Sequence, residues 1–343
     1  MTGWDVGGPA EALHRDMLVW DNIFPFGNNW LLSWMVPGAN IGSFEPKYIN
    51  LARYGRSGAN IVGLTVSGDD SDSGLTMRIL AKELSFIREN PDTYILIETA
   101  DDVLRAMRVN KVGLILNFQG TDPLDRNLEM VEVYRRLGVR QMLIAYNRQN
   151  HAGCGCHEPV DPGLSSFGRA LVGELNRCGI IVDCSHTGYR TTMDVMEISS
   201  DPVVFSHSNA KEINAHDRNI TREQAEACAR TGGVVGVVGF DGFLRDNVMS
   251  VSNIVEQIDY YCDIIGSDHV GLGLDWMFWE AFPEFLAATA GRYKPGQYDT
   301  EIRFSPPEVL PQITEMLMAR GYTEQDIRKI MGENWLRVAR AVW

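Results

Sequence analysis

The chain has 343 residues and a net charge of −14, with 45% hydrophobic and 22% charged residues. This is the composition of an ordinary globular protein, and its negative field disfavours nucleic acid and anionic membranes as partners. The sequence offers neither a signal peptide nor an apolar stretch of the roughly 18 residues that a membrane-spanning helix needs. We therefore expect a cytoplasmic protein with no nucleic-acid or membrane partner, and we interpret its six cysteines as thiols.

Short apolar runs typical of strands recur along the chain, and segments with helical spacing separate them. These runs lie at 17–20, 59–66, 112–118, 141–145, 180–184, 202–205, 233–239 and 269–274. Ser165, Thr221 and Thr323 are typical residues for the start of a helix. The alternation predicts a (β/α)8 barrel of the TIM type, a single domain over 1–343 with extra C-terminal helices. A doubly wound open sheet is disfavoured, because "LVWDNIFPFG" contains no glycine-rich phosphate turn.

Polar residues follow the predicted strands, and in a barrel of this type the carboxyl ends of all strands meet at one face. In chain order they are Asp21, Asn22, Ser67, Asp69, Asp70, Gln119, Tyr146, Asn147, His186, His207, Asp241 and Asp275. Two of them share a pattern, since the runs 180–184 and 202–205 each end at a Ser-His dipeptide. Two imidazoles at adjacent strand ends, facing an aspartate across the barrel, are suitable ligands for zinc. A structural role in hydrogen bonding is the alternative for each histidine taken alone.

Several motifs resemble those of the membrane (renal) dipeptidase family, the M19 metallopeptidases of the amidohydrolase superfamily. They are "DCSHTG", "FSHSNA", "HDRN", "GGVVGVVGF", "DHVGLGLDW" and "IRKIMGENWLRV". The resemblance implies a (β/α)8 barrel with two zinc ions that cleaves dipeptides. It further implies that His186 and His207 are ligands of one metal, that Arg218 binds the substrate carboxylate and that Asp275 is the catalytic acid/base.

The chain departs from the family pattern at three places. Ile23 and Pro25 stand where the family has a histidine and an aspartate as ligands of the other metal, although Asp21 remains. Gln119 replaces the glutamate that bridges the two metals, and Tyr146 replaces an active-site histidine. A neutral amide suits a site with one cation fewer, because an unpaired buried carboxylate is costly. The sequence therefore predicts a divergent, bacterial-type member with about one zinc ion per chain.

This site predicts a metal-dependent hydrolase for a small carboxylate-bearing amide, either a dipeptide or an N-substituted amino acid. We expect His186, His207 and Gln119 to hold the metal, Asp275 and Tyr146 to act in catalysis, and Arg218, Tyr146 and Asn147 to bind substrate. Two alternatives stay open: a lyase-type, metal-assisted reaction on a related metabolite, and an inactive ligand-binding barrel. We also expect a homodimer.

The segment "HAGCGCHEP" follows the fourth predicted strand at the active face. It places Cys154, Cys156 and His157 close together. A second site for a soft metal is one interpretation. A glycine-rich loop that shapes the pocket is the other, and it is favoured because the segment lacks the separated pairs of a structural zinc site.

Overall fold

The computed structural model describes residues 4–25, 51–69, 71–276 and 303–343. Within them, nine strands form one sheet. The strands are β1 (Trp20–Phe24), β2 (Ile61–Gly68), β3 (Tyr94–Leu96), β4 (Val112–Gln119), β5 (Val139–Leu143), β6 (Ile181–Asp183), β7 (Val203–Val204), β8 (Val235–Val237) and β9 (Val270–Leu272). Their order is β7-β6-β5-β4-β2-β1-β9-β8, with β3 beside β4.

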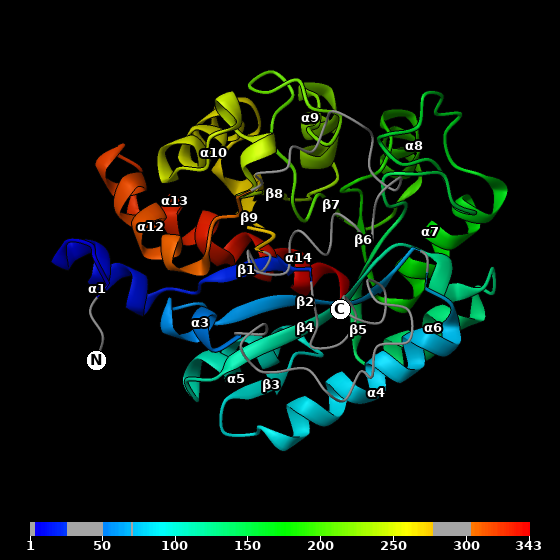
Figure 1. Cartoon of the computed structure of the whole chain (residues 1–343), viewed down its shortest axis with the longest axis horizontal. Coiled ribbons are helices and arrows are strands. Elements are labelled where there is room, and N and C mark those ends of the chain that lie inside the picture. The colour runs from blue at the N-terminus through cyan, green and yellow to red at the C-terminus, as the bar shows by residue number, and fades with distance from the viewer. Residues whose placement is uncertain (1–3, 26–50, 70, 277–302) are drawn as a thin grey trace.

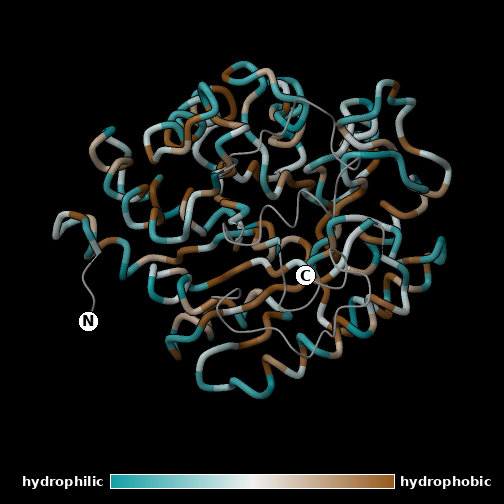
Figure 2. The backbone as a smooth tube through the Cα atoms, in the orientation of Figure 1, coloured by the Kyte–Doolittle hydropathy of each residue, from teal (hydrophilic) through white to brown (hydrophobic). Residues whose placement is uncertain are grey.

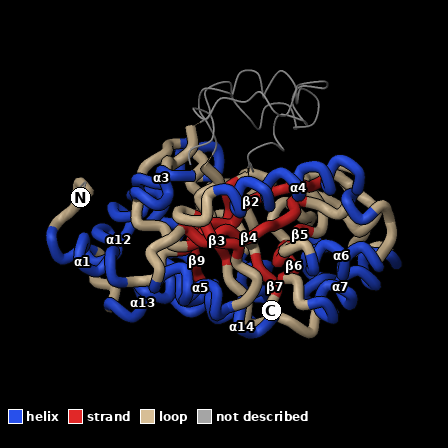
Figure 3. Tube along the Cα trace, turned by 90° about the horizontal axis from the view of Figure 1, so that it is seen from below, coloured by secondary structure: helices blue, strands red, loops and turns tan. Residues whose placement is uncertain are grey.

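The strands in this order pair in parallel and form a nearly closed barrel. Every pair of neighbouring strands is parallel. A further parallel bridge from Phe205 to Val235 joins the two ends of the order, β7 and β8. Seen from below, the strands occupy the centre and helices surround them (Figure 3). The predicted TIM-type barrel is therefore confirmed.

Helices connect successive strands and cover the outside of the barrel (Figure 1). They are α1 (Gly8–Asp16), α3 (Leu51–Arg56), α4 (Ser73–Glu89), α5 (Ala100–Arg108), α6 (Glu129–Arg136), α7 (Ser166–Cys178), α8 (Tyr189–Ile198), α9 (Arg222–Arg230), α10 (Val251–Ile265), α12 (Leu310–Ala319), α13 (Glu324–Arg328) and α14 (Asn334–Val342). Side chains cap the predicted starts: Ser165 accepts from Gly168, and Thr221 forms a capping box with Gln224. The expected C-terminal helices are α12 to α14.

The hydrophobic core is built around strands that are buried on both faces. All residues of β1, β2, β4 and β5 are buried, and the hydrophobic stretches of the trace run through the centre of the molecule (Figure 2). A parallel strand covered by helices on one side and the barrel interior on the other requires this composition. None of the described helices has the length and apolar character that crossing a membrane requires.

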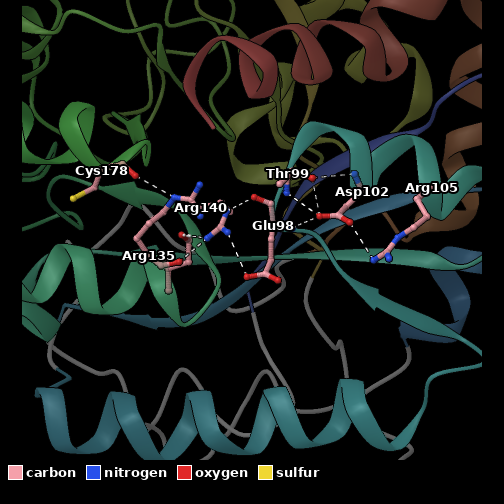
Figure 4. Close-up of polar contacts among 8 residues, drawn as sticks. Glu98, Thr99, Asp102, Arg105, Arg135, Arg140 and Cys178 are labelled. Atoms are coloured by element: carbon pink, nitrogen blue, oxygen red, sulfur yellow. Dashed lines mark hydrogen bonds and ion pairs between the residues drawn. The ribbon is translucent and has the colours of Figure 1, made fainter.

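At the amino ends of the strands, Arg140 closes the barrel with backbone contacts (Figure 4). Its guanidinium is 3% exposed and donates to the carbonyl oxygens of Glu98 (2.6 Å), Arg135 (2.8 Å) and Val139 (3.0 Å). The indole of Trp343 donates to the Arg140 carbonyl over 3.2 Å, so the C-terminus is anchored at the same end. These contacts stabilise the amino end of the barrel, whereas active sites of barrels of this type lie at the opposite, carboxyl end of the strands.

Candidate active site and metal centre

The two Ser-His dipeptides meet at the carboxyl ends of β6 and β7. His186 and His207 are 6% and 0% exposed, and their Nε2 atoms lie 2.9 Å apart. The ring centroids are 4.9 Å apart at an interplanar angle of 62°. Adjacent parallel strands thus bring together two imidazoles that are 21 residues apart in the sequence.

Each imidazole has an oxygen atom opposite its Nδ1. His186 Nδ1 lies 2.7 Å from Asn147 Oδ1, and His207 Nδ1 lies 2.6 Å from Ser206 Oγ. The thiol of Cys156 donates to the same Asn147 oxygen over 3.5 Å. Burial raises the pKa of Cys156 to about 12, so this thiol stays protonated and remains a donor. The outer nitrogens are therefore occupied, and the inner Nε2 atoms point at one another.

The donor set fits one divalent cation. Two imidazole nitrogens on one tetrahedral zinc ion are about 3.3 Å apart, because each Zn–N bond is about 2.0–2.1 Å long. The observed separation of 2.9 Å is close to that value. Burial lowers the pKa of both His186 and His207 well below its ordinary value, and the charge of Arg218 lowers it further. Both rings are thereby kept neutral, which is the form that binds metal.

The rest of a ligand set is sparse. Among the described residues, no group of three or more His, Cys, Asp and Glu side chains could hold a metal. Gln119 is buried at the end of β4, where its Nε2 donates to Thr65 Oγ1 over 3.1 Å. Any metal contact of Gln119 would consequently use its amide oxygen, and its role as a ligand stays a prediction.

The end of β1 does not provide ligands for a second cation. Ile23 is fully buried there and has no donor atom, and the next residue but one is the buried Pro25. Asp21 is also fully buried, and its Oδ1 accepts a hydrogen bond of 2.7 Å from the Leu274 amide. The residues present at this position therefore do not fit the second zinc ion of the family pattern.

Arg218 is a buried cation beside the imidazoles. It is 2% exposed, and its Nη2 donates to the His207 carbonyl oxygen over 3.3 Å. Its guanidinium carbon lies 5.2 Å from the centre of the Phe243 ring. No carboxylate of the described residues forms an ion pair with it, and its Nε has no hydrogen-bond partner among them. Because a buried cation without a carboxylate at ion-pair distance is costly, this position is complementary to an anionic ligand.

Asp275 follows β9 and lies on the same face as the imidazoles. Burial raises the pKa of Asp275 to about 7; Arg218 opposes the increase, and the charge of Asp21 adds to it. Asp275 has a φ of 58°, and Asn147 and His186 have φ values of 60° and 61°. Non-glycine residues in this left-handed region are strained by about 1–3 kcal/mol each, and such strain clusters at functional sites.

Tyr146 stacks on His186, with ring centroids 3.9 Å apart and an interplanar angle of 24°. Its amide donates to Asp69 Oδ2 over 2.9 Å. The carboxylate of Asp69 also accepts from the amides of Thr121 (2.8 Å) and Asp122 (3.2 Å). Asp69 therefore connects the segments that follow β2, β4 and β5. The predicted strand-end residue Asp70 lies outside the described residues.

The remaining sequence candidates have mainly structural surroundings. Cys154 and Cys156 are free, as are the other four cysteines, so the expectation of thiols is confirmed. The 'HAGCGCHEP' loop is pinned by an antiparallel bridge from Gly155 to Thr187, and the described residues there include no metal-binding group. Both interpretations of this segment, a loop that shapes the pocket and a second site for a soft metal, stay predictions. The Asp241 carboxylate accepts hydrogen bonds from the amides of Gly242 (2.7 Å) and Arg303 (2.9 Å).

Sequence reasoning missed the polar residues that support the imidazoles from below. Asp183, Ser206 and Gln141 are at most 2% exposed and lie within the barrel. One signal was available: Asp183 is a carboxylate in the middle of the apolar run 180–184. Buried charges are rare unless they are paired or hydrogen-bonded, so such a residue indicates an interior polar network.

Comparison with known proteins places these features in a family. The model of the family described as membrane dipeptidase, peptidase family M19, matches residues 38–291. Dipeptidase tcpJ of Claviceps purpurea is 29% identical over 248 residues, which are 71% of this chain and 54% of that protein. An uncharacterised dipeptidase of Schizosaccharomyces pombe is 31% identical over 250 residues, which are 71% of this chain and 56% of that protein. The chain thus matches about half the length of these curated relatives.

Solved structures share the fold over nearly the whole chain. An amidohydrolase from Pseudomonas aeruginosa is 30% identical, with a TM-score of 0.86 over 97% of this chain and 99% of that one. A metallopeptidase from Rhodobacter sphaeroides, liganded with a phosphinate mimic of the dipeptide L-Ala-D-Ala, is 21% identical. Its TM-score is 0.77 over 96% of this chain and 100% of that chain. At that identity the second likeness supports the fold alone.

Proposed function

Because the chain belongs to the membrane dipeptidase family, peptidase family M19, we propose that it is a metal-dependent hydrolase of a small amide that carries a carboxylate. One observation carries the proposal: two neutral imidazoles direct their Nε2 atoms to one point, beside a buried guanidinium that has no carboxylate partner among the described residues. The first feature suits a cation and the second suits an anionic substrate group.

The chain's own residues have separate roles in this reaction. Arg218 presents a planar fork that binds and orients the substrate carboxylate. Asp275, with its pKa raised to about 7, exchanges a proton near neutral pH and is the general acid/base. Tyr146 and Asn147 line the approach to His186, and the Tyr146 hydroxyl is the donor for a developing oxyanion. A divalent ion held by His186 and His207 would supply a water of lowered pKa and a polarised carbonyl.

We further propose that the site holds a single metal ion per chain. It rests on Ile23, which offers no ligand at the end of β1, and on Gln119, whose amide nitrogen is engaged with Thr65. Loss of one of two cations removes several kcal/mol of transition-state stabilisation, and each ~1.4 kcal/mol is a factor of about ten in rate. We therefore expect slow or absent hydrolysis of ordinary dipeptides and preference for another carboxylate-bearing amide, such as an N-substituted amino acid.

The proposed single-metal site also favours a second candidate function. A site with one cation suits a lyase-type, metal-assisted reaction of a small amino-acid-derived metabolite, in which no hydroxide is needed. An inactive ligand-binding barrel is the third reading, and Asp275 and Arg218 argue against it because both are retained at the site.

Metal content tests the site. Protein purified without added metal should contain about one divalent ion per chain by elemental analysis, and the metal should be lost in His186→Ala and His207→Ala. His269→Gln is the matched control, because His269 Nδ1 bonds to the Gly233 carbonyl at the amino end of β9. Two tightly held ions per chain would contradict the single-metal proposal.

A substrate panel tests the reaction. Simple dipeptides and N-acyl or N-methyl amino acids should be incubated with the zinc-loaded enzyme, and product amines quantified. Slow turnover of dipeptides together with faster turnover of one N-substituted class is the expected result. Fast turnover of simple dipeptides would show that one cation suffices or that a second is bound.

A further inference from the structure

Three asparagines in the segment that follows β7 bind the backbone of the segment that follows β8. Asn209 and Asn219 both donate from Nδ2 to the carbonyl oxygen of Phe243, over 3.3 Å and 3.0 Å. Asn214 donates from Nδ2 to the carbonyl oxygens of the two residues that flank Phe243, over 3.2 Å and 2.6 Å. We call these three side chains the asparagine clamp. It binds three successive carbonyl oxygens of one loop from a single neighbouring segment.

The backbone partners of the clamp determine the direction of its amide groups. Carbonyl oxygens only accept hydrogen bonds, so the Nδ2 atoms must face them. Asn209 also pairs with both backbone groups of Val238: its Oδ1 accepts from the Val238 amide and its Nδ2 donates to the Val238 carbonyl oxygen, each over 3.0 Å. Asn209 and Asn219 are 0% and 3% exposed. The clamp is therefore a buried connection with a defined arrangement of donors and acceptors.

The clamp places the Phe243 ring against Arg218. The guanidinium carbon of Arg218 lies over this ring, 5.2 Å from its centre. Phe240 packs edge-on against the same ring, with centroids 4.3 Å apart and an interplanar angle of 67°. Arg218 directly precedes Asn219 in the chain, so the backbone beside Asn219 carries the cation while the Asn219 side chain holds the residue that carries the ring. One residue thus connects both partners of the contact.

This contact matters because Arg218 has weak restraints of its own. Its Nη2 donates to the His207 carbonyl oxygen over 3.3 Å, which is longer than the usual range of about 2.7–3.2 Å for an N–H···O bond. A cation over an aromatic face is attracted to the ring, and more strongly when both are shielded from water. Arg218 and Phe243 are 2% and 4% exposed. The ring is therefore a main restraint on the position of the guanidinium.

We propose that Asn219 is a positioning residue for ligand recognition: it holds the Phe243 ring against Arg218 and so keeps the guanidinium in place before a carboxylate binds. Asn209 and Asn214 hold the same loop from the same segment. The inference rests on the proposed function in taking a carboxylate as the ligand of Arg218. Ordering one long side chain on binding weakens affinity by up to about tenfold, and a guanidinium that is already ordered avoids this cost.

The first test measures how well the protein distinguishes a carboxylate from its neutral amide. The probes are levulinate and levulinamide, in which a ketone replaces the amide bond that a hydrolase would cleave. Dissociation constants are measured by calorimetric titration, and their ratio is the carboxylate selectivity. Asn219→Ala should weaken levulinate binding by about tenfold and levulinamide binding by less than about twofold. Equal weakening of both probes would mean a general loosening of the site and would overturn the proposal.

Asn334 provides the matched control for Asn219. It is also 3% exposed, and its Nδ2 also donates to two carbonyl oxygens, those of Ser267 (2.7 Å) and Val270 (2.8 Å) at the amino end of β9. Asn334→Ala should lose a similar amount of thermal stability and keep the carboxylate selectivity of the parent. An equal loss of selectivity in the two variants would show that reduced stability alone explains the effect, against the proposal.

The second test asks whether the Phe243 ring transmits the effect. Phe243→Leu removes the ring and keeps the carbonyl oxygen that the clamp binds, so it tests the ring even if Asn219→Ala does not fold. Selectivity should again fall by about tenfold. The double variant Asn219→Ala/Phe243→Leu should have the selectivity of Phe243→Leu alone, because both changes remove one contact. Effects that multiply in the double variant, or full selectivity in Phe243→Leu, would contradict the proposal.

The third test reads the order of Arg218 in the protein without ligand. A ¹H–¹⁵N correlation spectrum of protein labelled with ¹⁵N-arginine shows the Nε–H groups, and Arg218→Met identifies the Arg218 signal. In the parent and in Asn334→Ala this signal should carry a ring-current shift and the heteronuclear NOE of an ordered group. Both should be lost in Asn219→Ala. An Arg218 side chain that is equally ordered in Asn219→Ala and in the parent would refute the proposal.

These results separate the inference from the proposed function. If the parent binds levulinate no better than levulinamide, the proposed recognition of a carboxylate by Arg218 fails. The Nε–H signal of the ligand-free protein still decides whether Asn219 positions Arg218, because it requires no ligand and no turnover.

Discussion

At the scale of single residues, Arg218 has the most unusual energetics in the site. It is a cation at 2% exposure whose guanidinium contacts a carbonyl oxygen and an aromatic ring rather than a carboxylate among the described residues. Replacement of a buried charge by an apolar residue of similar volume is often neutral or stabilising. Arg218→Met should therefore leave the melting temperature of the free protein unchanged or higher. Carboxylate-bearing ligands should no longer stabilise the variant in a thermal-shift screen.

The control for Arg218 is a second arginine with ordinary surroundings. Arg245 is an exposed residue that pairs with Glu256, and Arg245→Met should keep the ligand-dependent shift. Ligands that stabilise Arg218→Met as much as the parent would show that the carboxylate binds elsewhere. A marked loss of stability in the ligand-free variant would show that the guanidinium is compensated by the protein itself.

Residue identity at the strand ends could be read from the sequence, whereas side-chain direction could not. The pattern of two Ser-His dipeptides was sufficient to expect that His186 and His207 lie together, because adjacent parallel strands end at one face. Gln119 was found at the expected strand end, but its hydrogen bond to Thr65 depends on a rotamer that no spacing encodes. Asp183 was overlooked for the same reason, since its partners come from two other strands or strand ends.

At the scale of elements, the types were predictable and the boundaries were less so. The run 17–20 was expected as the first strand, but β1 is Trp20–Phe24, because the polar Asp21 and Asn22 turn into the interior and are bonded there. The sequence also gave no indication of β3 (Tyr94–Leu96), which pairs only with the first half of β4. A short strand outside the barrel order has neither the length nor the full burial that makes a run recognisable.

Asp69 is the residue that holds the loop segments of the site in register with one another. Its carboxylate accepts from the amides of Thr121 and Tyr146 and from the Asn150 side chain. In Asp69→Asn an NH₂ group must face at least one of these donors, and a buried donor left unpaired costs about 1–3 kcal/mol. We expect the free energy of unfolding to fall by about 2 kcal/mol and His186 to lose its ordered contact with Tyr146.

Chemical denaturation of Asp69→Asn measures the loss, with Asp92→Asn at an exposed turn as the control. Metal affinity should also fall, since Tyr146 and Asn147 are adjacent in the same segment and Asn147 supports His186. Unchanged stability would mean that the three segments hold their positions without the carboxylate.

At the scale of the whole molecule, a helix from the first part of the chain packs against helices from the C-terminal part. In Figure 1 the first helix, α1, lies beside α12 near the C-terminal part of the chain. Closure of the barrel could be predicted from the alternation of apolar strands and helical segments, because it follows from burial of the strands. The expectations of one domain over 1–343, of a homodimer and of a cytoplasmic location concern the assembly and the cell, and they stay predictions.

His14 joins these distant parts and makes the stability of the whole fold depend on pH. It is 1% exposed, with Nδ1 2.8 Å from Thr314 Oγ1 on α12 and Nε2 2.9 Å from the Ser57 carbonyl oxygen after α3. Burial lowers the pKa of His14 to about 4 from its ordinary value of 6.5. The unfolded chain therefore binds the proton more readily than the folded protein, so stability is complete above about pH 6.5 and falls as the pH drops towards 4.

The variant His14→Gln isolates this contribution, because an uncharged amide does not titrate. The parent should lose about 2 kcal/mol relative to the variant between about pH 7.5 and about pH 5, as the pKa difference implies. Urea denaturation of both proteins at each pH measures the difference, and contributions of other buried groups cancel in it. His151→Gln, at an exposed position, is the matched control. A difference that is constant with pH would mean that the folded protein and the unfolded chain bind a proton at His14 equally well. A difference of the opposite sign, with the parent gaining stability as the pH falls, would mean that His14 is protonated in the folded protein.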